Sequence, residues 1–73
     1  MTKFEVGKVY KAGLFMKCTK RTAKMVTFER YHHYERYNER FDGTICLKIR
    51  NGGNFEECWT KSGRIIEAIS VAE

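Results

Sequence analysis

The fold follows from residues 14–31, which read LFMKCTKRTAKMVTFERY. Apolar side chains recur at every second position in both halves of this stretch: Met16 and Cys18, then Val26 and Phe28. A period of two is typical of half-buried antiparallel strands. The stretch therefore predicts two strands that each turn one apolar face toward a core.

The two strands predict a hairpin through residues 20–24. Matching their apolar faces places Cys18 opposite Val26 and Met16 opposite Phe28. The tip of this hairpin carries three cations and no anion: Lys20, Arg21 and Lys24. Such a tip is accessible to a phosphate backbone.

Length and composition set the outer bounds. The 73 residues predict one domain, 1–73, and a hydrophobic content of 42% is too high for a disordered chain. No apolar run approaches the length of a membrane span. Three cysteines, an odd number, and the absence of a signal-peptide pattern predict a reducing, cytoplasmic location.

The net charge of +5 is concentrated in one segment. Residues 6–28 contain no acidic side chain and six basic ones: Lys8, Lys11, Lys17, Lys20, Arg21 and Lys24. A segmental charge favours a directed electrostatic surface and an anionic partner. The alternative is that these cations lie on the solvent face of strands, where they discourage edge-to-edge pairing.

Further strands are expected beyond residue 43, where glycines again divide the chain. Ile45, Leu47 and Ile49 alternate with Cys46, Lys48 and Arg50. The closing segment 64–71 has isoleucines at a spacing that fits a helix, but its β-branched content and short length favour a last strand.

Residues 44–60 predict a second hairpin around Asn51-Gly52-Gly53-Asn54, and two registers are open. The favoured register has a three-residue loop in which Gly53 is left-handed. It pairs Ile49 with Phe55, Ile45 with Trp59 and Lys48 with Glu56. Glu57 then points inward, and Cys46 lies opposite Cys58 on the outer side. The other register has a two-residue loop and pairs Leu47 with Cys58 and Ile49 with Glu56. It leaves Phe55 and Trp59 exposed beside Lys48 and Arg50. The first buries both aromatics. The second would create an aromatic and basic surface suited to stacking on bases.

Residues 31–41, YHHYERYNERF, form an unusual connector with aromatics spaced by three, three and four. We expect a short helix or an irregular excursion whose tyrosines cover one end of the core. The functional alternative is a surface that binds a partner through Tyr34, Arg36, Tyr37 and Phe41, since these residue types are favoured at interfaces.

The sequence gives no sign of catalysis, of a metal site or of a cofactor. Cys18, Cys46 and Cys58 form no CxxC pair, so we expect them to be small buried hydrophobes. The adjacent His32 and His33 would point to opposite sides of a strand, which makes them a poor ligand pair. No phosphate-binding glycine loop precedes a helix.

Two segments, FEVGKVY at 4–10 and KRTAKMVT at 20–27, followed by Lys48-Ile49-Arg50, carry a family resemblance. Together they resemble a group of small proteins of bacterial phages and conjugative elements that have an FxVGKxY opening and an RTAKxVT turn. The resemblance implies a mobile-element origin and a small all-β domain. It supplies no activity and no functional residue.

The combined prediction is an all-β domain, a strongly bent antiparallel sheet of five or six strands or an SH3-like small barrel. We expect it to bind nucleic acid through five phosphate contacts: Lys17, Lys20, Arg21, Lys24 and Arg50. The alternative is a protein-protein module, such as a phage-borne inhibitor or adaptor of a host or defence complex. Self-association through an unpaired edge strand is a third hypothesis.

Overall fold

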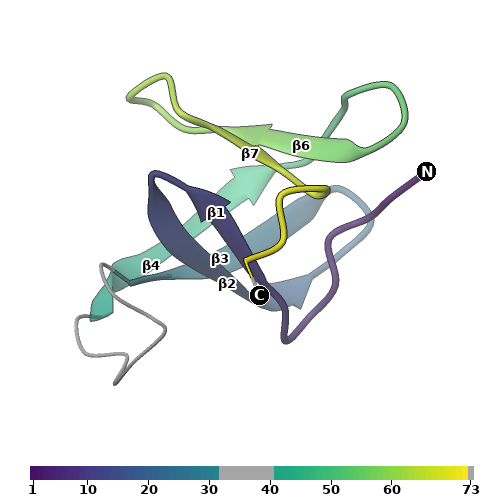
Figure 1. Ribbon diagram of the computed structural model, residues 1–73. Coiled ribbons are helices and arrows are strands. Elements are labelled where there is room, and N and C mark those ends of the chain that lie inside the picture. The colour runs from purple at the N-terminus through teal and green to yellow at the C-terminus, as the bar shows by residue number, and fades with distance from the viewer. Residues whose placement is uncertain (32–40, 73) are drawn as a thin grey trace.

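The computed structural model describes residues 1–31 and 41–72, which form seven β-strands and no helix (Figure 1). Every pair of neighbouring strands is antiparallel. The all-β prediction is confirmed, with seven strands in two sheets where the sequence predicted five or six in one. The helix considered for the 31–41 connector falls on residues 32–40, outside the described residues.

The chain builds a four-stranded sheet first and a three-stranded sheet second. The first has the order β1-β2-β3-β4, formed by Val9–Ala12, Leu14–Arg21, Met25–Tyr31 and Phe41–Lys48. The second has the order β5-β6-β7, formed by Arg50–Asn51, Glu56–Trp59 and Ile65–Glu67. Ile49 alone separates β4 from β5, so the chain passes directly from one sheet to the other. In Figure 1 the second sheet, green to yellow, lies above the first.

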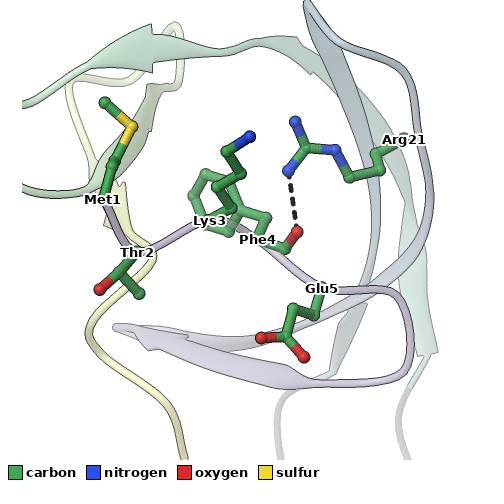
Figure 2. A pocket seen from close by; sticks show the side chains of 6 residues that line it. All are labelled: Met1, Thr2, Lys3, Phe4, Glu5 and Arg21. Atoms are coloured by element: carbon green, nitrogen blue, oxygen red, sulfur yellow. Dashed lines mark hydrogen bonds between the residues drawn. The ribbon is translucent and has the colours of Figure 1, made fainter.

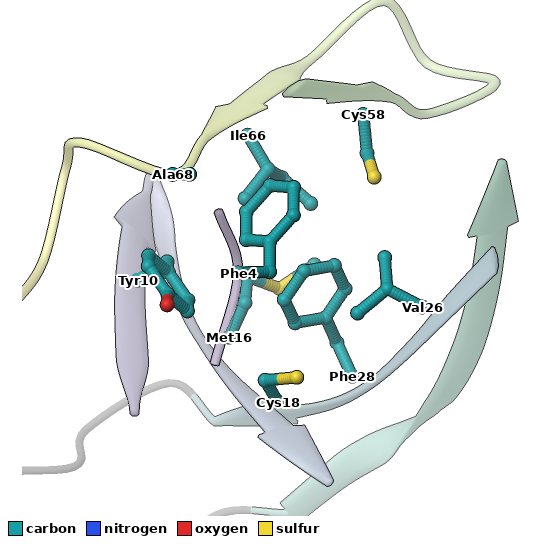
Figure 3. Close-up of a cluster of buried hydrophobic side chains, with 9 residues drawn as sticks. All are labelled: Phe4, Tyr10, Met16, Cys18, Val26, Phe28, Cys58, Ile66 and Ala68. Atoms are coloured by element: carbon teal, nitrogen blue, oxygen red, sulfur yellow. The ribbon is translucent and has the colours of Figure 1, made fainter. Parts of the chain in front are cut away.

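The core lies between the inner faces of the two sheets (Figure 3). Its buried members come from both sheets, from the N-terminal segment and from the segment after β7: Phe4, Tyr10, Met16, Cys18, Val26, Phe28, Cys58, Ile66 and Ala68. The ring of Phe4 meets those of Tyr10 and Phe28 edge to face, with centroids 5.0 and 5.3 Å apart. Each such aromatic pair adds about 0.5–1.5 kcal/mol to the burial of its area.

The hairpin of β2 and β3 has the predicted faces but not the predicted partners. Met16, Cys18, Val26 and Phe28 are all buried, as the period of two indicates. Cys18, however, faces Phe28 rather than Val26, and Met16 faces Arg30 rather than Phe28. The predicted register was wrong by two residues, a shift that leaves every side chain on the same face.

A β-bulge interrupts this hairpin between Cys18 and Lys20. Beyond the bulge Lys20 pairs with Thr27 and Arg21 pairs with Val26. Directly opposed residues share a face of the sheet, so Arg21 lies on the same side as the buried Val26. The extra residue of the bulge therefore turns Arg21 inward and Lys20 outward.

The predicted hairpin of residues 44–60 was wrong in both registers. β4 pairs with β3, where Ile45 faces Phe28 and Leu47 faces Val26. Only the short β5 pairs with β6, through Arg50 opposite Glu57. β3 offers β4 a ladder along its whole length, which a partner as short as β6 does not match.

The turn between β5 and β6 keeps one predicted feature. Gly53 has a φ of 103°, in the left-handed region, as the favoured register required. β5 ends at Asn51 and β6 begins at Glu56; between them the Gly52 N–H donates to the Phe55 carbonyl and the Gly53 N–H to the Asn51 side chain, both at 2.8 Å. Phe55 still packs against the core, while Trp59 stays half-exposed at 50%.

The closing segment is extended, as its β-branched content predicts. It forms β7, and Val71 then bridges Tyr10 of β1. Two backbone bonds of 2.8 Å, from the Lys11 N–H to the Ser70 carbonyl and from the Ala72 N–H to the Val9 carbonyl, fasten this segment to the edge of the first sheet.

Candidate functional site

Arg21, a predicted phosphate contact, forms an ion pair with Glu56 of β6. Its Nη1 and Nη2 donate to the two carboxylate oxygens at 2.7 and 3.1 Å. Nη1 also donates to the Phe4 carbonyl at 2.8 Å, the bond drawn as a dashed line in Figure 2. The Glu56 carboxylate accepts a further hydrogen bond, from the Phe4 N–H to Oε1 at 2.8 Å.

Burial and pairing act in opposite directions on Glu56, which is only 6% exposed. Burial by itself raises the pKa of this carboxyl, but the hydrogen bonds from Arg21 and Phe4 and the charge of Arg21 outweigh it, so the pKa is lowered. The hydrogen bond to Glu56 raises the pKa of Arg21. Both groups are therefore charged at neutral pH, and Arg21 serves to balance a buried carboxylate rather than to face solvent.

Three other predicted contacts lie together at the end of the first sheet that carries the β2–β3 turn. The Thr22 side chain shapes this turn by accepting from the Met25 N–H at 3.1 Å. The carbonyl of Lys24 accepts from the Ile49 N–H at 2.8 Å, which brings the junction of β4 and β5 against the turn. Lys20, Lys24 and Arg50 therefore lie at the same end of the molecule, on or beside this turn, and all three are exposed.

A fourth cation, Lys48, joins them because it pairs with Met25 at the start of β3. We call Lys20, Lys24, Lys48 and Arg50 the basic rim. Of the side chains that the structure describes, Lys8 pairs with Glu5 and Arg21 with Glu56, and no described carboxylate pairs with the basic rim. Lys48 was not predicted as a site residue because its expected partner was Glu56.

An exposed aromatic borders the basic rim. The guanidinium carbon of Arg50 lies 4.9 Å from the ring centroid of Trp59, and the indole N–H donates to Glu57 at 2.9 Å. The Arg50 side chain is thereby held over the tryptophan ring. An exposed Trp59 beside Arg50 was predicted only by the disfavoured register of the 44–60 hairpin. Trp59 is exposed because side chains alternate along β6, and Glu56 and Cys58 point inward.

Lys17 stands apart from the basic rim. It lies on the outer face of the first sheet opposite Glu29, and it is partly buried. The Tyr31 hydroxyl donates to Glu29 at 2.9 Å, so the carboxylate is fixed beside the lysine. Because Lys17 is partly buried and lies away from the β2–β3 turn, we leave it out of the candidate interface.

The predicted partner-binding residues are not part of this site. Tyr34, Arg36 and Tyr37 lie outside the described residues, and Phe41 is the first residue of β4. Their role stays a prediction.

The cysteines divide into two environments. Cys18 and Cys58 are fully buried, as expected, and burial raises the pKa of Cys18 and raises that of Cys58 to about 12. Cys46 is exposed on the outer face of β4, so the expectations that it is buried and that it faces Cys58 were both wrong. In the described ranges no three His, Cys, Asp or Glu side chains gather as a metal site would require.

Comparison of the chain with protein-family models, with curated proteins and with solved structures finds no match. Among the residues described here there is also no helix with the length and apolar character needed to cross a bilayer. The candidate site is therefore defined by the geometry of the basic rim and Trp59 alone.

Proposed function

We propose that the protein is a non-catalytic module that binds nucleic acid through its phosphates, of the mobile-element origin that the sequence resemblance implies. The observation that carries the proposal is the convergence of the four exposed cations of the basic rim, none with a carboxylate partner in the described parts of the chain. Lysine and arginine side chains placed in this way neutralise phosphates without reading sequence.

Trp59 adds a second type of contact. A half-exposed indole beside a cation offers a face on which a base can stack, and stacking is worth about 1–3 kcal/mol per base. Stacking requires an unpaired base, so we expect tighter binding to single strands than to duplexes of the same sequence.

The size of the electrostatic contribution follows from the four cations. With four phosphate contacts the logarithm of the association constant falls with that of salt concentration at a slope of about −2.8 for single strands. Raising salt from roughly 50 to 200 mM then weakens binding by about 50-fold. Sequence changes in the oligonucleotide should matter far less.

Fluorescence anisotropy with labelled single- and double-stranded oligonucleotides at two salt concentrations tests the proposal. A double variant, Lys20→Gln with Lys24→Gln, removes two contacts and should lower the salt slope by about 1.4 for single strands. Its matched control, Lys8→Gln with Lys11→Gln, removes the same charge from two other exposed lysines. Absence of salt-sensitive binding by the unmodified protein, or an equal loss in the control, would refute the proposal.

A protein partner is the second candidate, and one observation favours it. Trp59 and Ile65 oppose each other on β6 and β7 and are 50% and 44% exposed, so the outer face of the second sheet presents adjacent apolar side chains. A pull-down after nuclease treatment separates the two candidates: a stoichiometric protein that is lost with Ile65→Ser but kept with the double lysine variant would favour the second.

A further inference from the structure

A second group of polar side chains lies away from the basic rim, at the other end of β3. It surrounds a recess of about 160 Å³ between the inner face of the first sheet and the turn that joins β6 to β7. Its apolar wall is formed by Leu14, Met16 and Ile45, and its polar wall by Arg30, Thr60, Ser62 and Arg64. The lining includes two guanidinium groups and two hydroxyls but no carboxylate.

Arg64 is fixed at the mouth of the recess by the turn between β1 and β2, which lies below the β6–β7 turn in Figure 1. Its Nη1 donates to the Ala12 carbonyl at 2.7 Å, and its guanidinium lies on Gly13, where a Cβ would overlap it. Gly13 has a φ of 84°, so both its conformation and its lack of a side chain accommodate the arginine. One of the five N–H groups of Arg64 is used by Ala12, and no carboxylate within the described residues pairs with it.

The two hydroxyls of the recess are fixed by the same β6–β7 turn. Thr60 and Arg64 are joined by a backbone bond of 2.9 Å, and the Arg64 N–H also donates to Thr60 Oγ1 at 3.0 Å. Ser62 Oγ lies 3.0 Å from Thr60 Oγ1. Lys61 of this turn lines an adjoining hollow that continues along β4 past Ile45 to Leu47. The Thr60 hydroxyl itself donates to the Arg64 carbonyl at 3.3 Å. Cations and the Ser62 hydroxyl are thus placed beside an apolar wall.

We propose that this recess binds an oxyanion, a phosphate or a carboxylate, carried by a small ligand with an apolar portion. A planar guanidinium held in one orientation can donate two parallel hydrogen bonds to either group. The Ser62 hydroxyl supplies a further donor, since the Thr60 hydroxyl donates to the Arg64 carbonyl at 3.3 Å, and Leu14, Met16 and Ile45 accept the apolar portion. The site is separate from the basic rim and does not depend on the nucleic-acid proposal.

The test uses phenyl phosphate and benzoate as probes. Two simpler probes serve as controls: inorganic phosphate, which lacks the apolar portion, and benzyl alcohol, which lacks the charge. Amide chemical shifts of the full chain report both affinity and location. We expect phenyl phosphate or benzoate to shift the amides of residues 60–64 and 12–14, and to bind more tightly than either simpler probe. Shifts confined to the turn at residues 22–24, or no saturable shift with either probe, would overturn the proposal.

Two variants establish the role of Arg64. Arg64→Gln removes the cation from an exposed position and should weaken binding by about 10- to 100-fold, the loss expected for a hydrogen bond to a charged group. Gly13→Ala should also weaken binding, because the new Cβ displaces the Arg64 guanidinium. Its control is Gly53→Ala, which imposes a similar backbone strain at a φ of 103° but has no atom within 4 Å of the new Cβ. This control should keep the affinity. Unchanged binding in Arg64→Gln refutes the assignment even if Gly13→Ala fails to fold.

Discussion

Replacing Arg21 by methionine would leave the Glu56 carboxylate buried without its cation. The substitution keeps a long apolar side chain in place but removes the donors to both carboxylate oxygens and the donor to the Phe4 carbonyl. Glu56 would retain one hydrogen bond from the described residues, that of the Phe4 N–H. Because Glu56 is only 6% exposed, water cannot replace what is lost.

The expected loss is large for a chain of this size. Removing one partner of a buried ion pair costs roughly 3–5 kcal/mol, and because the Arg21 side chain is 20% exposed we expect the lower end, about 3 kcal/mol. A domain of 73 residues has a total stability of about 4–11 kcal/mol. The variant should therefore melt roughly 12–24 °C below the unmodified protein, at 4–8 °C per kcal/mol.

Urea unfolding followed by far-ultraviolet circular dichroism measures the free energy of unfolding directly. Its pH dependence gives an independent check. The pKa of Glu56 is lowered in the folded protein, so the pair stabilises the fold above the pKa of an unfolded glutamate and loses that contribution as pH falls through the folded pKa. Protonation also neutralises the unpaired carboxylate of the variant, so the difference between the two proteins should shrink on acidification.

Two controls separate the ion pair from general effects. Lys20→Met alters the neighbouring cation, which faces outward, and should change stability by no more than about 0.5 kcal/mol. The double variant Arg21→Met with Glu56→Leu removes both charges and should recover most of the loss. A cost below about 1 kcal/mol for Arg21→Met alone, or a cost that does not change with pH, would refute the reasoning.

Three further predictions concern the core and the cysteines. Alkylation of the native protein should modify Cys46 alone, because Cys18 and Cys58 are buried and burial raises the pKa of both; mass spectrometry before and after unfolding would show it, and rapid native labelling of Cys58 would contradict the fold. Tyr10→Phe removes the acceptor of the Glu5 N–H and should cost about 1 kcal/mol in thermal unfolding. Phe28→Ala opens the centre of the core and should cost about 3–5 kcal/mol, a large share of the domain's stability, seen as a lower midpoint of urea unfolding in circular dichroism.

The fold class and the apolar faces could be predicted from the sequence because both depend on a local period. The period of two places alternate side chains on one face of a strand, and this face is buried at Met16, Cys18, Val26 and Phe28. The partners could not be predicted, because a shift of two residues preserves every face and so leaves the period unchanged. The choice of β3 rather than β6 as the partner of β4 depends on a ladder between residues that are far apart along the chain.

The candidate site was predictable to a similar extent. The run of basic residues in the sequence predicted Lys20 and Lys24 as phosphate contacts, and Arg50 was predicted with them. The charge pattern could not identify Lys48 or the exposure of Trp59, because both depend on the register of β4 and β6 rather than on composition. Nor could it locate the recess around Arg64, whose parts come from β1, β2, β3, β4 and the β6–β7 turn.

The assignment of Arg21 to the interior depends on a single extra residue. If the hairpin continued without a bulge from the pair of Cys18 and Phe28, Lys20 would face Val26 on the inner side and Arg21 would point outward. Glu56 would then meet a lysine, which is a compact charge, rather than a planar group able to bond both carboxylate oxygens and the Phe4 carbonyl together. The bulge exchanges the two cations and so satisfies the buried carboxylate. Because the two partners are 35 positions apart, no pattern within residues 14–31 can show which cation stays available to phosphate.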